Sequence, residues 1–181
     1  LKREEQTLAS PSILAIKGLA QFKRYPAVVA LGNMIENWHV SDFHITRGRE
    51  VPYDGYAEHL SREGENLALV TKYLYENKRP IFDAILDRLP RCVPGLTKVV
   101  PKLTDEQRVL LRFQDGAFTE PFLSRYVSDG TIKMFAYLVL LFDPSPYPLL
   151  CIEEPENQLY PTLLTTLAQE FRAYANRGGQ V

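Results

Sequence analysis

Two adjacent acids, Glu153 and Glu154, stand directly after the apolar run "PLLCI" and directly before a proline. An apolar run of this kind predicts a buried strand, and ligands of an α/β sheet bind beyond the carboxyl ends of its strands. One carboxylate at that edge can hold Mg²⁺ while its neighbour polarises an attacking water, as nucleotide hydrolysis requires. Adjacent glutamates can also simply solvate a strand end, so the pair alone leaves both interpretations open.

A second stretch that could bind a ligand, Ser128-Asp129-Gly130-Thr131, opens a run that is apolar almost throughout. This pattern predicts a buried helix, and the unpaired N–H groups and positive end of a helix form an anion site. The hydroxyl groups and the glycine would let a phosphate approach closely. Alone, these residues are equally an ordinary N-cap, but they stand about 20 residues before the two glutamates.

The surrounding pattern predicts the elements that position these residues. The buried helix, the short strand and an amphipathic helix over 161–174 follow one another, an order typical of an α/β sheet. Residues 96–124 predict a small antiparallel unit with an Asp115-Gly116 hairpin signal, and "HVSDFHITRG" alternates as a strand would. Two short helices are expected within 11–38. Two amphipathic helices are expected within 64–95, the second started by Pro80 and closed by Pro90 together with Pro94 and Gly95.

These elements predict a mixed α/β fold in two parts. A mainly helical lobe would span residues 1–95. Residues 96–181 would hold the small antiparallel unit, the buried helix and the strand that ends in acids.

The composition excludes several classes of protein. With 45% hydrophobic and 24% charged residues among 181, the chain is typical of a soluble globular protein. Lys plus Arg number 21 and Asp plus Glu 22, so no broad positive field favours nucleic acid. The apolar run 134–142 is too short for a bilayer, which needs about 20 residues, and we expect a cytoplasmic protein with no membrane partner. Cys92 and Cys151 indicate neither a disulfide framework nor a zinc site.

The block "SDGTIKMFAYLVLLFDPSPYPLLCIEEPENQLYPTLLTTLAQEF" resembles the signature helix, Walker B and D-loop region of an ABC-type ATPase of the RecF/SMC-like branch. That branch includes the overcoming-lysogenization-defect nucleases. The block is roughly the last third of the sequence, and "LSREGENLALVTKYL" resembles part of the lobe that such ATPases insert before the signature motif. The resemblance implies a partial ABC-ATPase-like sheet flanked by helices, ATP and Mg²⁺ as cofactors, and a homodimer that sandwiches nucleotide.

By position, the resemblance assigns the chemical step to the two glutamates. Glu153 falls on the Walker B acid that binds Mg²⁺, and Glu154 falls on the general base that orients water. The family usually has Asp at the first position, and the longer side chain of Glu153 can place a water in the metal contact or displace it. Tyr160 stands where relatives often carry His, and we attach no mechanism to it.

Two further motifs of the family act across the dimer. The signature motif contacts the γ-phosphate of a nucleotide held by the opposite protomer, and the D-loop reaches across the interface. The matching residues are Ser128, Asp129 and Gly130 of the signature motif, and Asn157, Gln158 and Leu159 of the D-loop.

The phosphate-binding loop of such ATPases, the Walker A motif G-x-x-x-x-G-K-[ST], does not occur in the sequence. A strand carrying a switch histidine is also not reached before Val181. We therefore expect an internal or C-terminal portion of an ATPase whose first lobe lies upstream, and no tight ATP binding by this chain alone.

For the full-length protein we expect ATP binding and hydrolysis at a head-to-head dimer interface. The resemblance implies DNA repair, DNA maintenance or phage defence as roles, and it is the only ground for DNA as a partner. Two alternatives stay open. One is a non-catalytic interaction or regulatory module derived from such an ATPase. The other is a metal-dependent nuclease built on Glu153 and Glu154, for which no further acidic cluster is evident.

Overall fold

The computed structural model describes residues 15–181, which form one compact unit ending at Trp38 and a second over His39–Val181. The first unit contains helices α1 (Ala15–Leu19) and α2 (Pro26–Glu36). Gly32 of α2 lies close to Ala20, the residue directly after α1: an added Cβ at Gly32 would lie 2.5 Å from the Cβ of Ala20. The two predicted short helices are confirmed, except that residues 11–14 lie outside the described residues. The division expected at residue 95 stays a prediction.

The second unit contains a parallel sheet of two short strands, β1 (His39–Ser41) and β5 (Leu150–Ile152), with His39 opposite Leu150 and Ser41 opposite Ile152. The strand predicted in "HVSDFHITRG" is therefore only three residues long. The backbone N–H groups of Asp42 and His44 donate to the carbonyls of Arg62 and Glu63 instead. The chain then turns into helix α3 (Ile45–Gly48).

A separate antiparallel sheet contains β2 (Leu96–Leu103), β3 (Val109–Asp115) and β4 (Phe122–Leu123), in that order, and a 3₁₀ turn, η1 (Ser124–Tyr126), follows. This confirms the antiparallel unit predicted over 96–124. The Asp115-Gly116 pair does not close a tight hairpin. Strand β3 ends at Asp115 and β4 begins only at Phe122, which pairs with Phe113, so a longer loop joins the two strands. The long hairpin is the one between β2 and β3.

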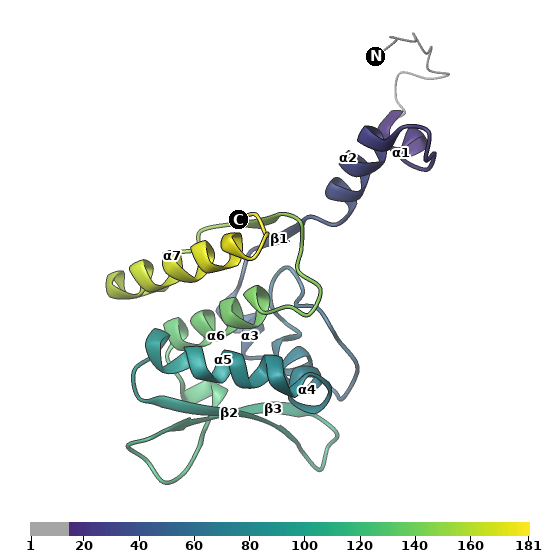
Figure 1. Cartoon of the computed structure of the whole chain (residues 1–181). Helices are drawn as coiled ribbons and strands as arrows, with labels where there is room; N and C mark the ends of the chain where they lie inside the picture. Colours follow the sequence, from purple (N-terminus) through teal and green to yellow (C-terminus); the bar gives the residue numbers. More distant parts are fainter. Residues whose placement is uncertain (1–14) are drawn as a thin grey trace. The chain divides into compact units, whose positions relative to one another are not determined.

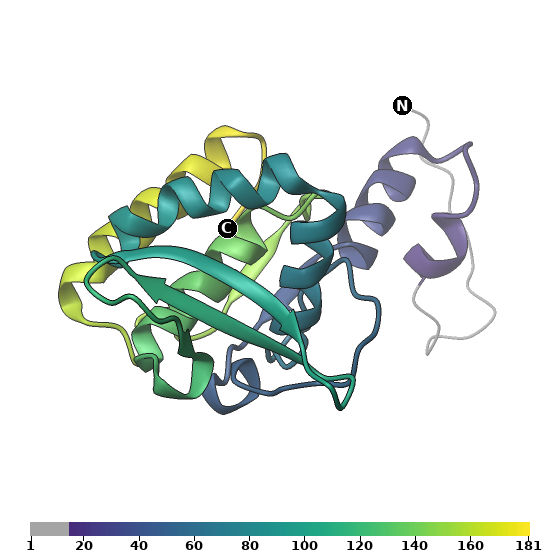
Figure 2. The same ribbon diagram turned by 90° about the horizontal axis from the view of Figure 1, so that it is seen from below.

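Four longer helices complete this unit: α4 (Leu67–Asn77), α5 (Arg79–Cys92), α6 (Asp129–Leu141) and α7 (Pro161–Asn176). Figure 1 shows α4 and α5 between the antiparallel sheet and α6, with α7 on the other side of α6. Figure 2 shows β2 and β3 lying across the helices. Helix α5 ends at Cys92, between Pro90 and the Pro94-Gly95 pair, as predicted. Pro90 itself lies inside the last turn, which buries Leu89 and Cys92 completely.

Helix α6 is the centre of the core. Every residue from Gly130 to Leu141 is buried, and the ring of Phe135 contacts that of Phe113 on β3 at 5.6 Å between centroids. The predicted α/β fold, with a parallel sheet, a small antiparallel sheet and flanking helices, is confirmed. In the described part of the chain, no helix combines the length and the apolar character that crossing a membrane would need.

Candidate functional site

The carboxyl ends of β1 and β5 bring two acids together. Asp42 follows β1 and Glu153 follows β5, and the N–H of Glu153 donates to the carbonyl of Ser41 at 2.9 Å. A cavity of about 200 Å³ lies at this edge. Its lining residues are Asp42, Phe43, His44, Ile45, Thr46, Arg49, Asp129, Lys133, Glu153, Glu154, Asn157 and Gln158.

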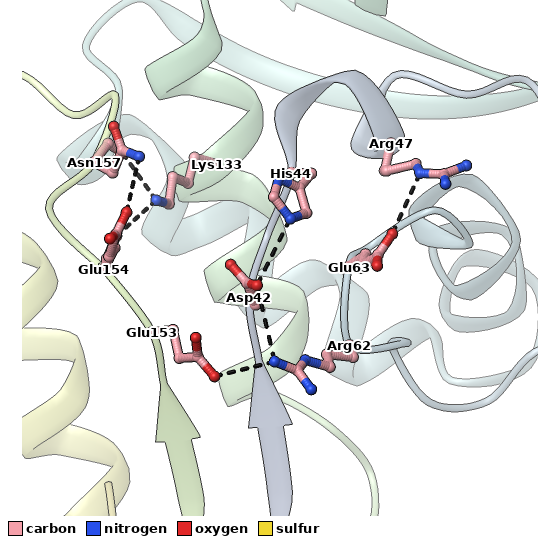
Figure 3. Close-up of polar contacts among 9 residues, drawn as sticks. All are labelled: Asp42, His44, Arg47, Arg62, Glu63, Lys133, Glu153, Glu154 and Asn157. Carbon is pink, nitrogen blue, oxygen red and sulfur yellow. Dashed lines mark hydrogen bonds and ion pairs between the residues drawn. The ribbon is translucent and has the colours of Figure 1, made fainter.

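An arginine from a distant loop neutralises the two acids (Figure 3). The Nη2 of Arg62 lies 3.1 Å from Oε1 of Glu153 and 3.9 Å from Oδ2 of Asp42. The loop is held in turn by Asn66, whose Oδ1 accepts from the N–H and the hydroxyl of Ser61 at 2.9 Å. The guanidinium and both carboxylates remain accessible to solvent, so these pairs add little stability and mainly balance charge.

Glu154 begins a tight turn that ends at Gln158. The φ angle is +40° at Glu154 and +61° at Gln158, and a positive φ is costly for residues other than glycine. Within the turn, the N–H of Asn157 donates to the carbonyl of Glu154 at 3.0 Å. The side-chain amide of Asn157 also donates to Oε2 of Glu154 at 3.2 Å, so the carboxylate is held by the turn that it starts.

A buried lysine on α6 supports the turn from beneath. Lys133 is 2% exposed, and its Nζ donates to the carbonyls of Glu154 and Asn157, each at 2.9 Å. Burial lowers the pKa of Lys133, while the nearby charges of Glu156, Glu154 and Asp42 partly oppose that shift. The lysine is thus a donor whose charge is partly offset by three nearby acids.

The N-terminus of α6 borders the same cavity on one side. The hydroxyl of Ser128 caps the helix by accepting from the N–H of Thr131 at 3.2 Å. Arg49 pairs with Oδ1 of Asp129 at 2.5 Å and donates to the carbonyl of Val127 at 2.6 Å. This end of α6 is therefore fixed to α3 by a cation.

Gly130 is buried, and its position explains why a glycine is needed. A Cβ added there would lie 3.3 Å from the carbonyl oxygen of Gln158 and 3.7 Å from Cδ2 of Leu159. The segment predicted to be the signature motif thus packs directly against the turn predicted to be the D-loop.

The structure brings most, but not all, of the predicted site residues to one cavity. Five of the eight line it: Asp129, Glu153, Glu154, Asn157 and Gln158. Ser128 and Gly130 line an adjacent hollow of about 240 Å³ beside Tyr160, and Leu159 is partly buried against the core. The chemical roles assigned to these residues stay predictions.

Four residues of the site escaped the sequence analysis: Asp42, Arg49, Arg62 and Lys133. Two of them had a readable signal. Lys133 is the only charged residue between Thr131 and Phe142, in a run otherwise suited to burial. Asp42 follows a strand-like segment, as Glu153 does. Arg49 and Arg62 had no such signal in the sequence, because contacts between loops and distant residues bring them to the site.

A larger cavity lies elsewhere, beside α5, α6 and α7. It measures about 510 Å³ and is lined mainly by α5, the end of α6 and the end of α7, including Arg88, Asp143 and Arg177. None of the predicted site residues lines it. We place the site at the smaller cavity because carboxylates, a helix N-terminus and a strained turn converge there.

Comparison with known proteins identifies one family. A family model described as "AAA domain, putative AbiEii toxin, Type IV TA system" matches residues 4–181. No curated protein and no solved structure matches the chain.

Proposed function

We propose a function on the premise that this chain belongs to the AAA domain family whose model matches residues 4–181. Membership of this family supports a nucleotide-binding, ATPase-like function. Our proposal is finer: in its full-length form the protein is a RecF/SMC-like ATPase that hydrolyses ATP between two copies. The observation that carries it is the convergence of Asp42, Glu153 and Glu154 at a parallel sheet edge that the N-terminus of α6 borders.

Glu154 is the residue we assign to the chemical step. Its carboxylate is exposed at the cavity and held by Asn157, so it can accept a proton from, and orient, an attacking water. A general base must be fixed within hydrogen-bond reach of its water. The tight turn and the amide contact supply that fixation on the protein side.

The acids next to Glu154 fit a magnesium ion. Mg²⁺ in nucleotide sites takes oxygen ligands, commonly one or two carboxylates together with phosphates and waters. Glu153 and Asp42 offer two carboxylates at adjacent strand ends. Within the described residues no group of three or more His, Cys, Asp or Glu side chains could hold a metal ion. In this proposal, phosphate and water would supply the remaining ligands. When bound, the ion would neutralise charge on the phosphates.

The dimer is proposed from the other predicted motifs. Ser128 is exposed at the mouth of α6, where free N–H groups of the first turn can meet a phosphate held by a facing copy. Asn157 and Gln158 are exposed at the turn beside it. A facing subunit would therefore meet both motifs at once.

The test is Glu154→Gln in the full-length protein that carries this segment. We expect ATP binding to stay nearly intact and turnover to fall by a factor on the order of 10² or more, as loss of a general base does. Glu156→Gln is the matched control, since it removes a neighbouring exposed carboxylate to which no role in the chemical step is assigned. Unchanged turnover in Glu154→Gln would remove the residue from this role.

The family description and the resemblance noted above support a proposal for the process that hydrolysis serves. We propose phage defence through a toxin–antitoxin system, with DNA repair as the alternative. Growth arrest on expression of the wild-type protein, and normal growth with Glu154→Gln, would support the first. If the wild-type protein neither binds nor hydrolyses ATP, the non-catalytic interaction module is the better description.

A further inference from the structure

We propose that Lys133 is a positioning residue that fastens the turn 154–158 to α6 and so sets the orientation of the Glu154 carboxylate. The proposal deepens the function given above by naming how the signature helix and the base are coupled, and its catalytic part rests on that function. Its structural part, the clamp itself, does not.

The burial of Lys133 indicates that its amine has a structural role. A lysine is rarely buried unless its amine is paired, because losing hydration is costly. Lys133 is 2% exposed and sits among apolar residues of α6. Its amine makes two hydrogen bonds of 2.9 Å, both to backbone carbonyls of one turn. A methionine would fill the same space without that cost, so hydrophobic packing does not explain the lysine.

The contacts lead from Lys133 to the carboxylate in two steps. Lys133 fixes the carbonyl of Asn157, and the side-chain amide of Asn157 donates to Oε2 of Glu154 at 3.2 Å. Lys133 also fixes the carbonyl of Glu154, whose own φ of +40° is unfavourable. Without the amine, the turn loses two bonds that hold a strained conformation in place.

A second contact joins the same two elements one helical turn earlier. Gly130 lies so close to the turn that an added Cβ would be 3.3 Å from the carbonyl oxygen of Gln158. Helix α6 therefore contacts both ends of the turn: Lys133 contacts its first residue, Glu154, and Gly130 lies against its last residue, Gln158. A ligand that moves or fixes the mouth of α6 would move or fix the base with it. This gives the signature segment of one subunit a direct connection to the base of the same subunit.

The first experiment tests the clamp without nucleotide. In the full-length protein, Lys133→Met is compared with wild type by hydrogen exchange of a peptide covering residues 153–160. Loss of two hydrogen bonds should raise exchange at the Asn157 amide on the order of tenfold. Lys133→Arg, which keeps a donor for both carbonyls, should restore most of the protection. Lys72→Met, which removes a partly buried lysine paired with Asp54 on another face, is the control and should leave this peptide unchanged.

The second experiment tests the catalytic part. Lys133→Met should lower the turnover number at least tenfold with little change in KM for ATP, and Lys133→Arg should recover it in part. Unchanged exchange in the 153–160 peptide would overturn the clamp. Normal turnover together with raised exchange would overturn the positioning role. A wild-type protein without ATPase activity would refute the proposed function alone, because the exchange experiment would still decide the clamp.

Discussion

The positive φ of Glu154 makes a prediction about stability that is independent of catalysis. Glu154 has φ of +40°, whereas the adjacent Glu153 is not among the described residues with positive φ. We compare four variants: Glu154→Ala, Glu154→Gly, Glu153→Ala and Glu153→Gly. Each pair loses the same carboxylate, so the difference between Gly and Ala reports only on the backbone.

The expected magnitude follows from two opposing effects. At an ordinary position Gly is less stable than Ala by about 0.5–1 kcal/mol, because the unfolded chain gains freedom. At position 154 glycine also relieves left-handed strain of about 1–2 kcal/mol. The free energy of unfolding of Glu154→Gly should therefore equal that of Glu154→Ala or exceed it by up to about 1.5 kcal/mol. The difference in unfolding free energy between the Gly and Ala variants should change by about 1–2 kcal/mol from position 153 to position 154. The entropic contribution is the same at both positions and cancels in this comparison.

Urea unfolding followed by far-UV circular dichroism measures this difference, provided that the slope m is the same in all four variants. An equal Gly–Ala difference at both positions would show that the turn carries no backbone strain. The reasoning about Lys133 and the turn would then lose one of its supports. Glu154→Gly should also lack ATPase activity in the full-length protein, so that a gain in stability accompanies a loss of function.

Two further predictions concern buried titratable groups. Burial raises the pKa of Asp143 above its ordinary value of 3.8, and hydrogen bonds from His59 and Ser145 only partly oppose this. The folded state thus binds the proton more tightly than the unfolded state, so this contribution is present at low pH and is lost as pH rises through the raised pKa. The urea midpoint should therefore fall less between about pH 4 and pH 7 in Asp143→Asn than in wild type, and an equal change of midpoint with pH in both would contradict this. Burial also raises the pKa of the Cys92 thiol to about 11. Iodoacetamide at about pH 8 should therefore label Cys151 well before Cys92, and equal labelling rates of the two cysteines in the folded protein, measured by mass spectrometry, would contradict this.

The elements that carry the site were predictable because their signals are local. Ser128 is a capping residue directly before a long apolar run, and α6 begins beside it. Pro161 stands at the first turn of α7, where its missing N–H removes no helical bond. The strand before Glu153 is short, but its apolar run is bounded by a proline-rich segment and two acids. Local propensity and packing agree at each of these places.

The cations of the site could not be placed from the sequence, because they depend on contacts between distant residues. Arg62 meets Glu153 across 91 positions, and Arg49 meets Asp129 across 80. No spacing rule relates residues so far apart. Unlike the two arginines, Lys133 has a signal in the sequence, because a single lysine in an apolar helix indicates a buried donor. Its partners could not be predicted, because they are two backbone carbonyls of a turn and no residue type marks them.

The strand predicted in "HVSDFHITRG" shows why boundaries fail. Its pattern is that of a strand over several residues, yet pairing with β5 stops at Ser41. The loop carrying Arg62 and Glu63 then takes the N–H groups of Asp42 and His44. The tertiary partner of the backbone, not the side-chain alternation, decided where the strand ended.

Arg62 gives the paired acids a counter-charge that belongs to the protein itself. The proposed magnesium site would therefore differ from that of small domains whose ion is required for their structure. Under the proposed function, loading of Mg²⁺ would exchange one positive partner for another at acids that Arg62 already neutralises. Such a protein would be idle but intact without magnesium, and would resume work when the ion returned.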